Sequence, residues 1–172
     1  LVMDYLTAAV SELGSISERR IEQLVNPAFS QAPAFLVKDK GLNSGFMIAQ
    51  VAAASLVSES KSLAFPASVD SIPTSAGKED HVSMGTIAAR KCAQVAENTR
   101  SVLALEILAA CQALDLRRPL TTSPALQAVH RRVRREVPFL ERDTFLHPLF
   151  LKVRAMADEL VAVAEKQVGP LS

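Results

Sequence analysis

Four consecutive ionisable residues, Lys78, Glu79, Asp80 and His81, are the side chains of this sequence best suited to chemistry. A carboxylate at Glu79 could hold a cationic amine or imidazole, or act as a base. His81 could carry a proton near neutral pH, although a histidine near a helix start is more often hydrogen-bonded to backbone. Asp80 has a structural interpretation, because either Asp80 or Ser83 could cap the helix that follows.

These residues end a long segment without a regular hydrophobic period. It lies between two expected helices, one from about Phe46 to Leu63 and one from Ser83 to about Leu116. A structureless segment of this length inside a compact domain is uncommon and is usually functional or disordered. Pro66 and Pro73 stiffen it, so we interpret it as an active-site loop.

The other periodic stretches predict further helices and no strand. Hydrophobic residues at helical spacing predict helices over residues 2–25, 124–137 and 144–168. Asn26-Pro27 ends the first helix and Ser123-Pro124 is a start signal for the second. Asp143 is the expected cap of the third, which Gly169-Pro170 ends. The predicted fold class is all-α, a bundle of long helices.

The chain of 172 residues fits a single helical domain with a sizeable core. Within residues 1–172 we expect residues 1–118 to form the bundle helices and the active-site loop, and residues 119–172 to form C-terminal helices. Much of the hydrophobic content is alanine, which favours closely packed helices. The helix at 83–116 carries one apolar stripe, made of Ala88, Cys92, Val95, Thr99 and Val102. Beyond Ser101 it is apolar nearly all round, as in a helix buried inside a bundle or an assembly.

The charge distribution argues against a general polyanion binder, because the formal net charge is only +1. Arg131, Arg132, Arg134 and Arg135 could contact phosphates. They lack aromatic partners and a recognisable nucleic-acid motif. We therefore favour a solvated face or a subunit contact for this cluster, and we expect no nucleic-acid partner.

Two cysteines, Cys92 and Cys111, lie on one expected helix about 28 Å apart, too far for a disulfide. No Cys/His cluster suggests a metal site. Reduced, buried thiols are the simplest interpretation and fit a cytoplasmic protein.

No apolar stretch is long enough for a membrane span, so no membrane partner is expected. A helical pattern is already under way at Leu1, which suggests a piece of something longer.

Three motifs carry a resemblance to a known family: NSGFMIAQ at 43–50, PASVDS with PTSA at 66–76, and EDHVSM at 79–84. With the residues around them they resemble the C-terminal part of the aromatic amino acid ammonia-lyase and aminomutase family, and within it the histidine-specific members. The resemblance is strong up to Pro119 and thins beyond it. It implies an all-helical enzyme that assembles as a homotetramer around long helices, with active sites built from several subunits.

The resemblance also implies an electrophile that this sequence lacks. In the family a methylidene-imidazolone group forms by self-cyclisation of an Ala-Ser-Gly tripeptide, and no Ala-Ser-Gly occurs here. The catalytic tyrosines and the carboxylate-binding arginine of the family also precede the region that this chain resembles. The resemblance therefore places no catalytic residue in this chain, and we expect the isolated chain to be inactive.

Two positions correspond to substrate-binding residues of the family. Glu79 occupies the acidic position that lines the pocket in histidine-specific members, where members acting on tyrosine or phenylalanine tend to have Gln. Met47 matches an apolar pocket position, with ordinary core packing as its alternative. Lys78, Asp80 and His81 would stand behind Glu79. The implied reaction is elimination of ammonia from L-histidine to give urocanate, without a metal.

Two alternatives remain at this point. Family members often have Asn-Gln where this chain has Gly77-Lys78, which leaves open a related lyase or aminomutase acting on another aromatic amino acid. The long helix at 83–116 and the missing tripeptide would also suit a non-catalytic helical assembly module.

Overall fold

The computed structural model describes residues 1–169, and this part of the chain contains helices and no strand. The predicted all-α class is confirmed. Short 3₁₀ turns occur at Ala34–Leu36, Ala67–Val69 and Ser75–Gly77. In chain order the α-helices are α1 (Val2–Val25), α2 (Pro27–Ser30), α3 (Met47–Leu63), α4 (Gly85–Leu116), α5 (Pro124–Arg134), α6 (His147–Ala155) and α7 (Ala157–Val168).

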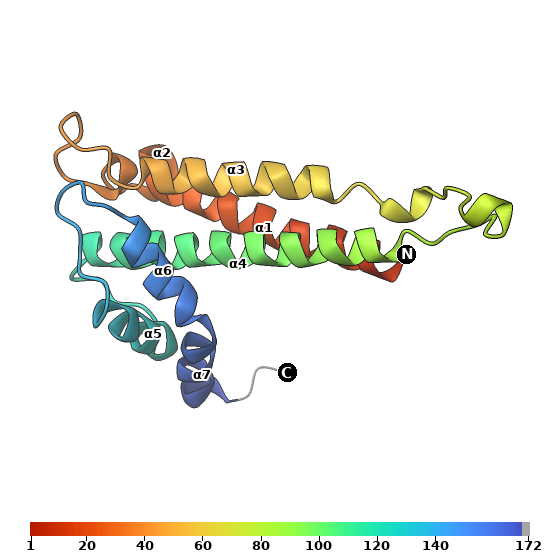
Figure 1. Ribbon diagram of the computed structural model, residues 1–172. Coiled ribbons are helices and arrows are strands. Elements are labelled where there is room, and N and C mark those ends of the chain that lie inside the picture. Colours follow the sequence, from red (N-terminus) through yellow and green to blue (C-terminus); the bar gives the residue numbers. More distant parts are fainter. Residues whose placement is uncertain (170–172) are drawn as a thin grey trace.

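Three long helices, α1, α3 and α4, lie side by side in an elongated bundle (Figure 1). Small residues allow the close approach. Gly14 of α1 lies against α4, where an added Cβ would come within 3.2 Å of Thr99 Oγ1. The predicted stripe of α4, from Ala88 to Val102, is buried as expected.

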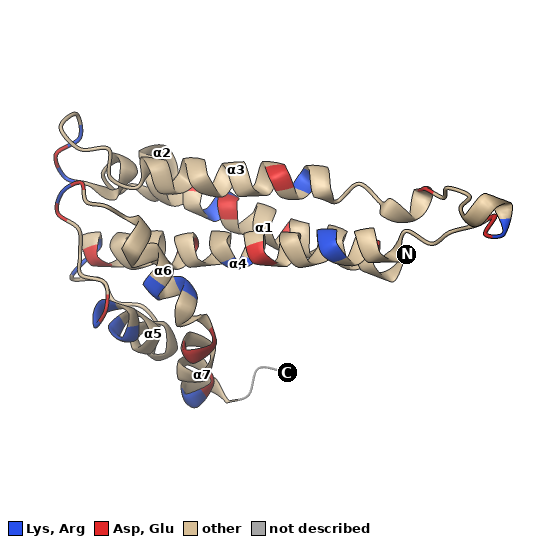
Figure 2. Ribbon diagram, in the orientation of Figure 1, with Lys and Arg blue, Asp and Glu red and all other residues tan. Residues whose placement is uncertain are grey.

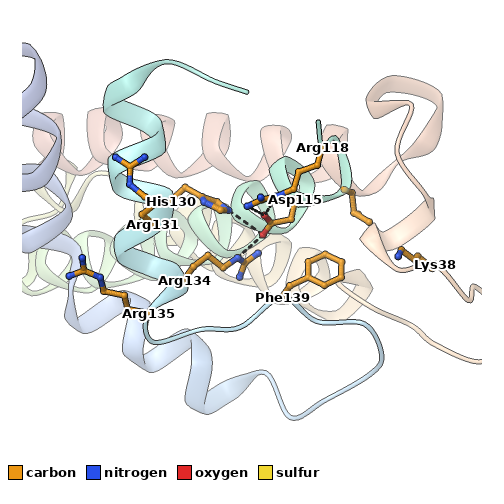
Figure 3. Close-up of a pocket in the computed structure, with 9 residues that line it drawn as sticks. Lys38, Asp115, Arg118, His130, Arg131, Arg134, Arg135 and Phe139 are labelled. Atoms are coloured by element: carbon orange, nitrogen blue, oxygen red, sulfur yellow. Dashed lines mark hydrogen bonds and ion pairs between the residues drawn. The ribbon is translucent and has the colours of Figure 1, made fainter. Parts of the chain in front are cut away.

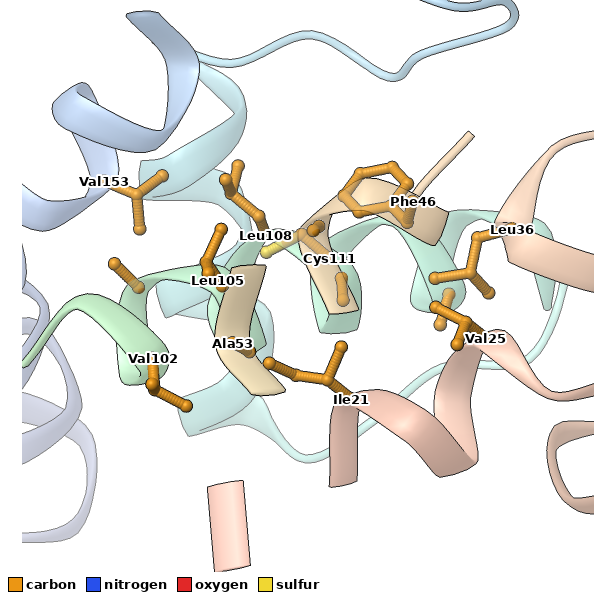
Figure 4. Packing of buried hydrophobic residues seen from close by; sticks show 14 of the residues in the cluster. Ile21, Val25, Leu36, Phe46, Ala53, Val102, Leu105, Leu108, Cys111 and Val153 are labelled. Atoms are coloured by element: carbon orange, nitrogen blue, oxygen red, sulfur yellow. The ribbon is translucent and has the colours of Figure 1, made fainter. Parts of the chain in front are cut away.

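The hydrophobic core is richest around the C-terminal half of α4 (Figure 4). Ile21 of α1, Ala53 of α3 and Leu108 of α4 are almost inaccessible to solvent there. Full burial of a side chain as large as Ile21 or Leu108 contributes roughly 1.5–3 kcal/mol of transfer free energy. Burial of this face therefore holds the three helices together.

Helix α6 packs on α4, whereas α5 and α7 pack mainly on each other, with α5 beside the C-terminal end of α4 (Figure 1). Ser123 caps α5 as predicted, because its hydroxyl accepts a hydrogen bond from the Leu126 N–H. The helix ends at Arg134, three residues earlier than expected. The single helix predicted over 144–168 is wrong: it divides at Met156 into α6 and α7. Gly169 follows α7 with a φ of +87°, and Pro170 lies outside the described residues.

Asp143 does not cap a helix, which corrects a second expectation. Its carboxylate accepts hydrogen bonds from the Ser44 N–H at 2.9 Å and the Gly45 N–H at 2.7 Å. The Asp143 N–H in turn donates to Asn43 Oδ1 at 2.8 Å. The helix after Asp143, α6, begins at His147, and Pro148 lies in its first turn. Asp143 thus fastens the start of α3 to the chain that leads into α6.

Candidate functional site

The segment of residues 64–84, here the tip loop, extends beyond one end of the bundle between α3 and α4 (Figure 1). It contains two short 3₁₀ turns and no longer helix, as the absence of a hydrophobic period predicts. The four ionisable residues from Lys78 to His81 lie in this loop, where Figure 2 shows both signs of charge near its end. The loop thus presents them away from the bundle.

Glu79 lies in a tight turn at the end of the tip loop. The Thr74 N–H donates to the Glu79 carbonyl at 3.0 Å, and the Glu79 N–H donates back to the Thr74 carbonyl at 3.3 Å. Between them Ser75, Ala76 and Gly77 all have positive φ, at 55°, 55° and 82°. Two consecutive non-glycine residues in this region are strained, and such strain clusters at functional sites. The Thr74 hydroxyl also donates to Glu79 Oε2 at 2.7 Å, which orients the exposed carboxylate.

Asp4 of α1 fastens the base of the tip loop. Its two carboxylate oxygens accept hydrogen bonds from the Ala67 and Ser68 N–H groups, each at 3.0 Å. Hydrogen bonding by the Ser68 side chain and by the Ala67 N–H outweighs burial and lowers the pKa of Asp4. Farther along, the Ser71 hydroxyl accepts a hydrogen bond from the Val82 N–H at 2.9 Å. The first part of the loop is therefore hydrogen-bonded to α1, and Ser71 joins it to the part that leads into α4.

The residues next to Glu79 are exposed: Lys78 precedes it, and Asp80 and His81 follow. The interpretation of Asp80 as a helix cap is wrong, because α4 begins only at Gly85. Ser83, the other candidate, accepts a hydrogen bond from the Gly85 N–H at 3.2 Å. Asp80 therefore lies outside α4 and does not cap it.

Met47 is the first residue of α3 and is half-buried. The tip loop follows the other end of α3, so the 17 residues of this helix alone separate Met47 from the loop by about 25 Å. One copy of the chain therefore does not bring Met47 and Glu79 together.

A second group of polar side chains, which the sequence analysis did not identify as a site, lies where α4 ends beside α5. The Asp115 carboxylate accepts hydrogen bonds from Arg134 Nε at 2.7 Å and Arg118 Nε at 3.0 Å, and lies 3.1 Å from His130 Nε2. Burial by itself would raise the pKa of Asp115, but hydrogen bonds from Arg134 and His130 outweigh it and lower that pKa. The available signal was one acidic residue near the end of a mostly apolar helix, followed by arginines.

The arginine cluster of α5 is thus partly paired within the chain. Arg132 donates to both carboxylate oxygens of Glu159 in α7, at 2.5 and 2.8 Å. Arg134 pairs with Asp115 at 2.7 Å. The expected solvated face applies to Arg131 and Arg135, which are exposed.

Across residues 1–169, no three His, Cys, Asp or Glu side chains are grouped as they would be to ligate a metal ion. In the same range no helix combines the length and the apolar character needed to cross a membrane.

Comparison with known proteins places this geometry in a family. The model of the family described as aromatic amino acid lyase matches residues 1–135. Histidine ammonia-lyase of Sorangium cellulosum is 54% identical over all of this chain and 34% of its own length. Histidine ammonia-lyase of Trypanosoma cruzi superposes with a TM-score of 0.92 at 48% identity, over 95% of this chain and 33% of that structure. Tyrosine aminomutase of Streptomyces globisporus superposes with a TM-score of 0.91 at 37% identity, over 99% of this chain and 33% of that structure.

The chain spans about a third of the length of the relatives that it matches. Within that third the similarity includes the tip loop, the three long helices and the start of α3. The family match over residues 1–135, together with the identity along the whole chain, shows that this chain belongs to the aromatic amino acid lyase family.

Proposed function

We propose that the chain contributes one wall of the active site of a histidine ammonia-lyase, which eliminates ammonia from L-histidine to give urocanate. The observation that carries this proposal is the difference in identity between relatives. The chain is 54% identical to a histidine ammonia-lyase along its full length, against 37% to a tyrosine aminomutase of nearly the same backbone. A shared backbone cannot distinguish the substrates, whereas side chains can.

Glu79 is the residue that we assign to the substrate. Its carboxylate is exposed at the end of the tip loop, and Thr74 holds one of its oxygens. L-Histidine carries an amino group and an imidazole that are cationic or readily protonated near neutral pH. A hydrogen bond from such a cation to a carboxylate is roughly twice as strong as a neutral one. Lys78, Asp80 and His81 would adjust the charge around that contact.

Met47 of a second copy of the chain would line the pocket to which Glu79 of the first copy contributes. Its separation from the tip loop along α3 supports a site that is assembled between subunits. A homotetramer is the assembly that we propose, since the bundle leaves many large apolar side chains exposed. Examples on its three long helices are Tyr5, Leu13, Ile48, Val51 and Leu103.

The electrophile must come from outside this chain, because the sequence contains no Ala-Ser-Gly from which a methylidene-imidazolone could form. When present, that group would supply the electrophilic carbon of the elimination. The contribution of the 172 residues is to bind and orient the substrate and to enclose it. Two buried, free thiols, Cys92 and Cys111, support a reducing, cytoplasmic location.

The test is Glu79→Gln in the full-length enzyme, with urocanate absorbance as the measurement. Histidine turnover should fall strongly, and Glu79→Asp should retain more of it. If histidine turnover survives while tyrosine turnover falls, the alternative of an enzyme for another aromatic amino acid replaces this proposal. Urocanate formation by the purified 172-residue chain would contradict its expected inactivity.

A further inference from the structure

A hollow of about 730 Å³ lies between the end of α4, α5 and the segment that carries Lys38 (Figure 3). Among its lining side chains are five basic ones and one carboxylate: Lys38, Arg118, Arg131, Arg134, Arg135 and Asp115. We call it the basic hollow. The tip loop precedes the other end of α4, whose 32 residues span about 48 Å, so the basic hollow is remote from Glu79.

The single carboxylate of the basic hollow is already fully engaged. Asp115 accepts hydrogen bonds from Arg118 and Arg134 and lies against His130. Figure 3 shows the three side chains converging on it. Asp115 therefore holds Arg134 in place and leaves a net positive charge around the hollow.

Several basic groups of the hollow have no acidic partner. Within the described part of the chain, no carboxylate lies within 4.0 Å of Lys38, Arg131 or Arg135. Arg134 Nη2 is buried and has no hydrogen-bond partner. A buried donor left unsatisfied costs about 1–3 kcal/mol, and like charges gathered in one hollow repel one another. Both costs would be relieved by an anion.

We propose that the basic hollow binds a small phosphate-bearing anion, with Arg131, Arg134 and Arg135 as the residues that contact its phosphate oxygens. Guanidinium groups match the geometry of phosphate through paired donors. The volume suits a small molecule, since ligand pockets usually measure about 300–1,000 Å³. The ring of Phe139 also lines the hollow and offers an apolar contact to the organic part of the ligand (Figure 3).

The concave shape and the composition favour a small ligand over a nucleic acid. A nucleic-acid surface would be expected to interleave several aromatic side chains with the basic ones, whereas the hollow has Phe139 alone. An acidic segment of another part of the protein is the other possible occupant, and it is separated from the proposal by the experiment below.

The experiment is calorimetric titration of the natural full-length protein, in its assembled form, with sodium tripolyphosphate as the probe. We expect saturable binding at an ionic strength kept constant with sodium chloride. The double variant Arg131→Gln/Arg135→Gln should weaken it on the order of tenfold or more, because two charge-assisted contacts are lost. Both side chains are exposed, so folding should be retained. This inference does not rest on the proposed function, since no turnover is measured.

The matched control is Arg90→Gln/Lys166→Gln, which removes the same net charge at exposed positions outside the hollow. It should bind tripolyphosphate as the unsubstituted protein does. Equal losses in the two double variants would mean unspecific attraction and would overturn the proposal. So would an absence of saturable binding in the unsubstituted protein, which is the result expected if an acidic segment already fills the hollow.

Discussion

The hydroxyl of Thr74 donates a 2.7 Å hydrogen bond to Glu79 Oε2, across the turn at the end of the tip loop. The backbones of the same two residues also exchange hydrogen bonds. One carboxylate oxygen is therefore held by the chain, and in the proposed function the other would receive the substrate cation. Preorganisation of this kind lowers the entropy lost when a substrate is bound.

Loss of the Thr74 hydroxyl should weaken substrate binding in the full-length enzyme. A hydrogen bond to a charged group contributes about 1.5–3 kcal/mol, so Thr74→Val should raise KM for histidine by roughly tenfold. The near-isosteric change keeps the β-branched shape of the side chain. Steady-state kinetics followed by urocanate absorbance measures the effect. Thr74→Ser, which keeps the hydroxyl, is the control and should stay near the unsubstituted value. A Val variant with unchanged KM would mean that the turn orients Glu79 without this bond.

The separation of Met47 from Glu79 along α3 leads to a second prediction, on mixed assemblies. We expect Glu79→Gln and Met47→Asp each to have low activity. Asp is compatible with the first position of α3, because a negative charge is favourable at a helix N-terminus. If each site takes the two residues from different subunits, a random equal mixture contains sites with both residues intact. Co-expression should then recover roughly a quarter of full activity.

The control for this mixture is the double variant Glu79→Gln/Met47→Asp co-expressed with the unsubstituted chain. The activity of this mixture is the reference for the case in which every defective subunit carries both changes and every other subunit is intact. Absence of recovery in the mixture of single variants would mean that one subunit supplies both residues. An active Met47→Asp enzyme would show that Met47 does not line the pocket.

Helices that bury a face could be predicted from the sequence almost to the residue. The stripe from Ala88 to Val102 follows the 3.6-residue period because it packs on α1 and α3, and α4 follows that prediction closely. The prediction failed for α6 and α7. The structure divides this predicted helix at Met156. The hydrogen bond between Asp143 and Ser44 joins residues 99 positions apart. Local periodicity contains no information about such contacts.

The candidate site was predictable for a different reason. The motif around Glu79 made the tip loop a candidate through its resemblance to a family. The lack of a hydrophobic period predicted only that the loop is irregular. Asp115 and His130 belong to no motif, and 15 positions separate them. Only the packing of α5 beside the end of α4 brings them together. The run of arginines was visible in the sequence, whereas the concave shape around Asp115 could not be deduced from the order of the residues.

Asp4 should control how firmly the tip loop is attached to the bundle. Asp4→Asn removes the charge and one of the two acceptor oxygens that receive the Ala67 and Ser68 N–H groups. We expect faster amide hydrogen exchange at Ala67 and Ser68, with little change in the core of α4. Asp70→Asn, at an exposed position of the same loop, is the control. Unchanged exchange in the Asp4 variant would show that the loop is held by other contacts, such as the one between Ser71 and Val82.

Asp115 should stabilise the packing of α5 against α4 in a pH-dependent way. Asp115→Asn leaves the Arg134 and Arg118 guanidinium groups without their carboxylate. We expect the free energy of unfolding to fall by about 1–3 kcal/mol near neutral pH. The folded-state pKa of Asp115 lies below its unfolded value. Its contribution is therefore fully present above the unfolded value of about 3.9 and is lost as the pH falls through the lower folded value.

Urea denaturation of the unsubstituted protein and of Asp115→Asn, at a series of pH values, measures this contribution. The difference between the two proteins should shrink as the solution is acidified below the unfolded pKa. Asp158→Asn is the matched control, because Asp158 also pairs with an arginine, Arg100, but is 89% exposed. Exposed pairs contribute little, about 0–1 kcal/mol, so this control should differ only slightly at any pH. A constant difference between Asp115→Asn and the unsubstituted protein across the acid range would show that the carboxylate stabilises the fold through its shape and not through its charge.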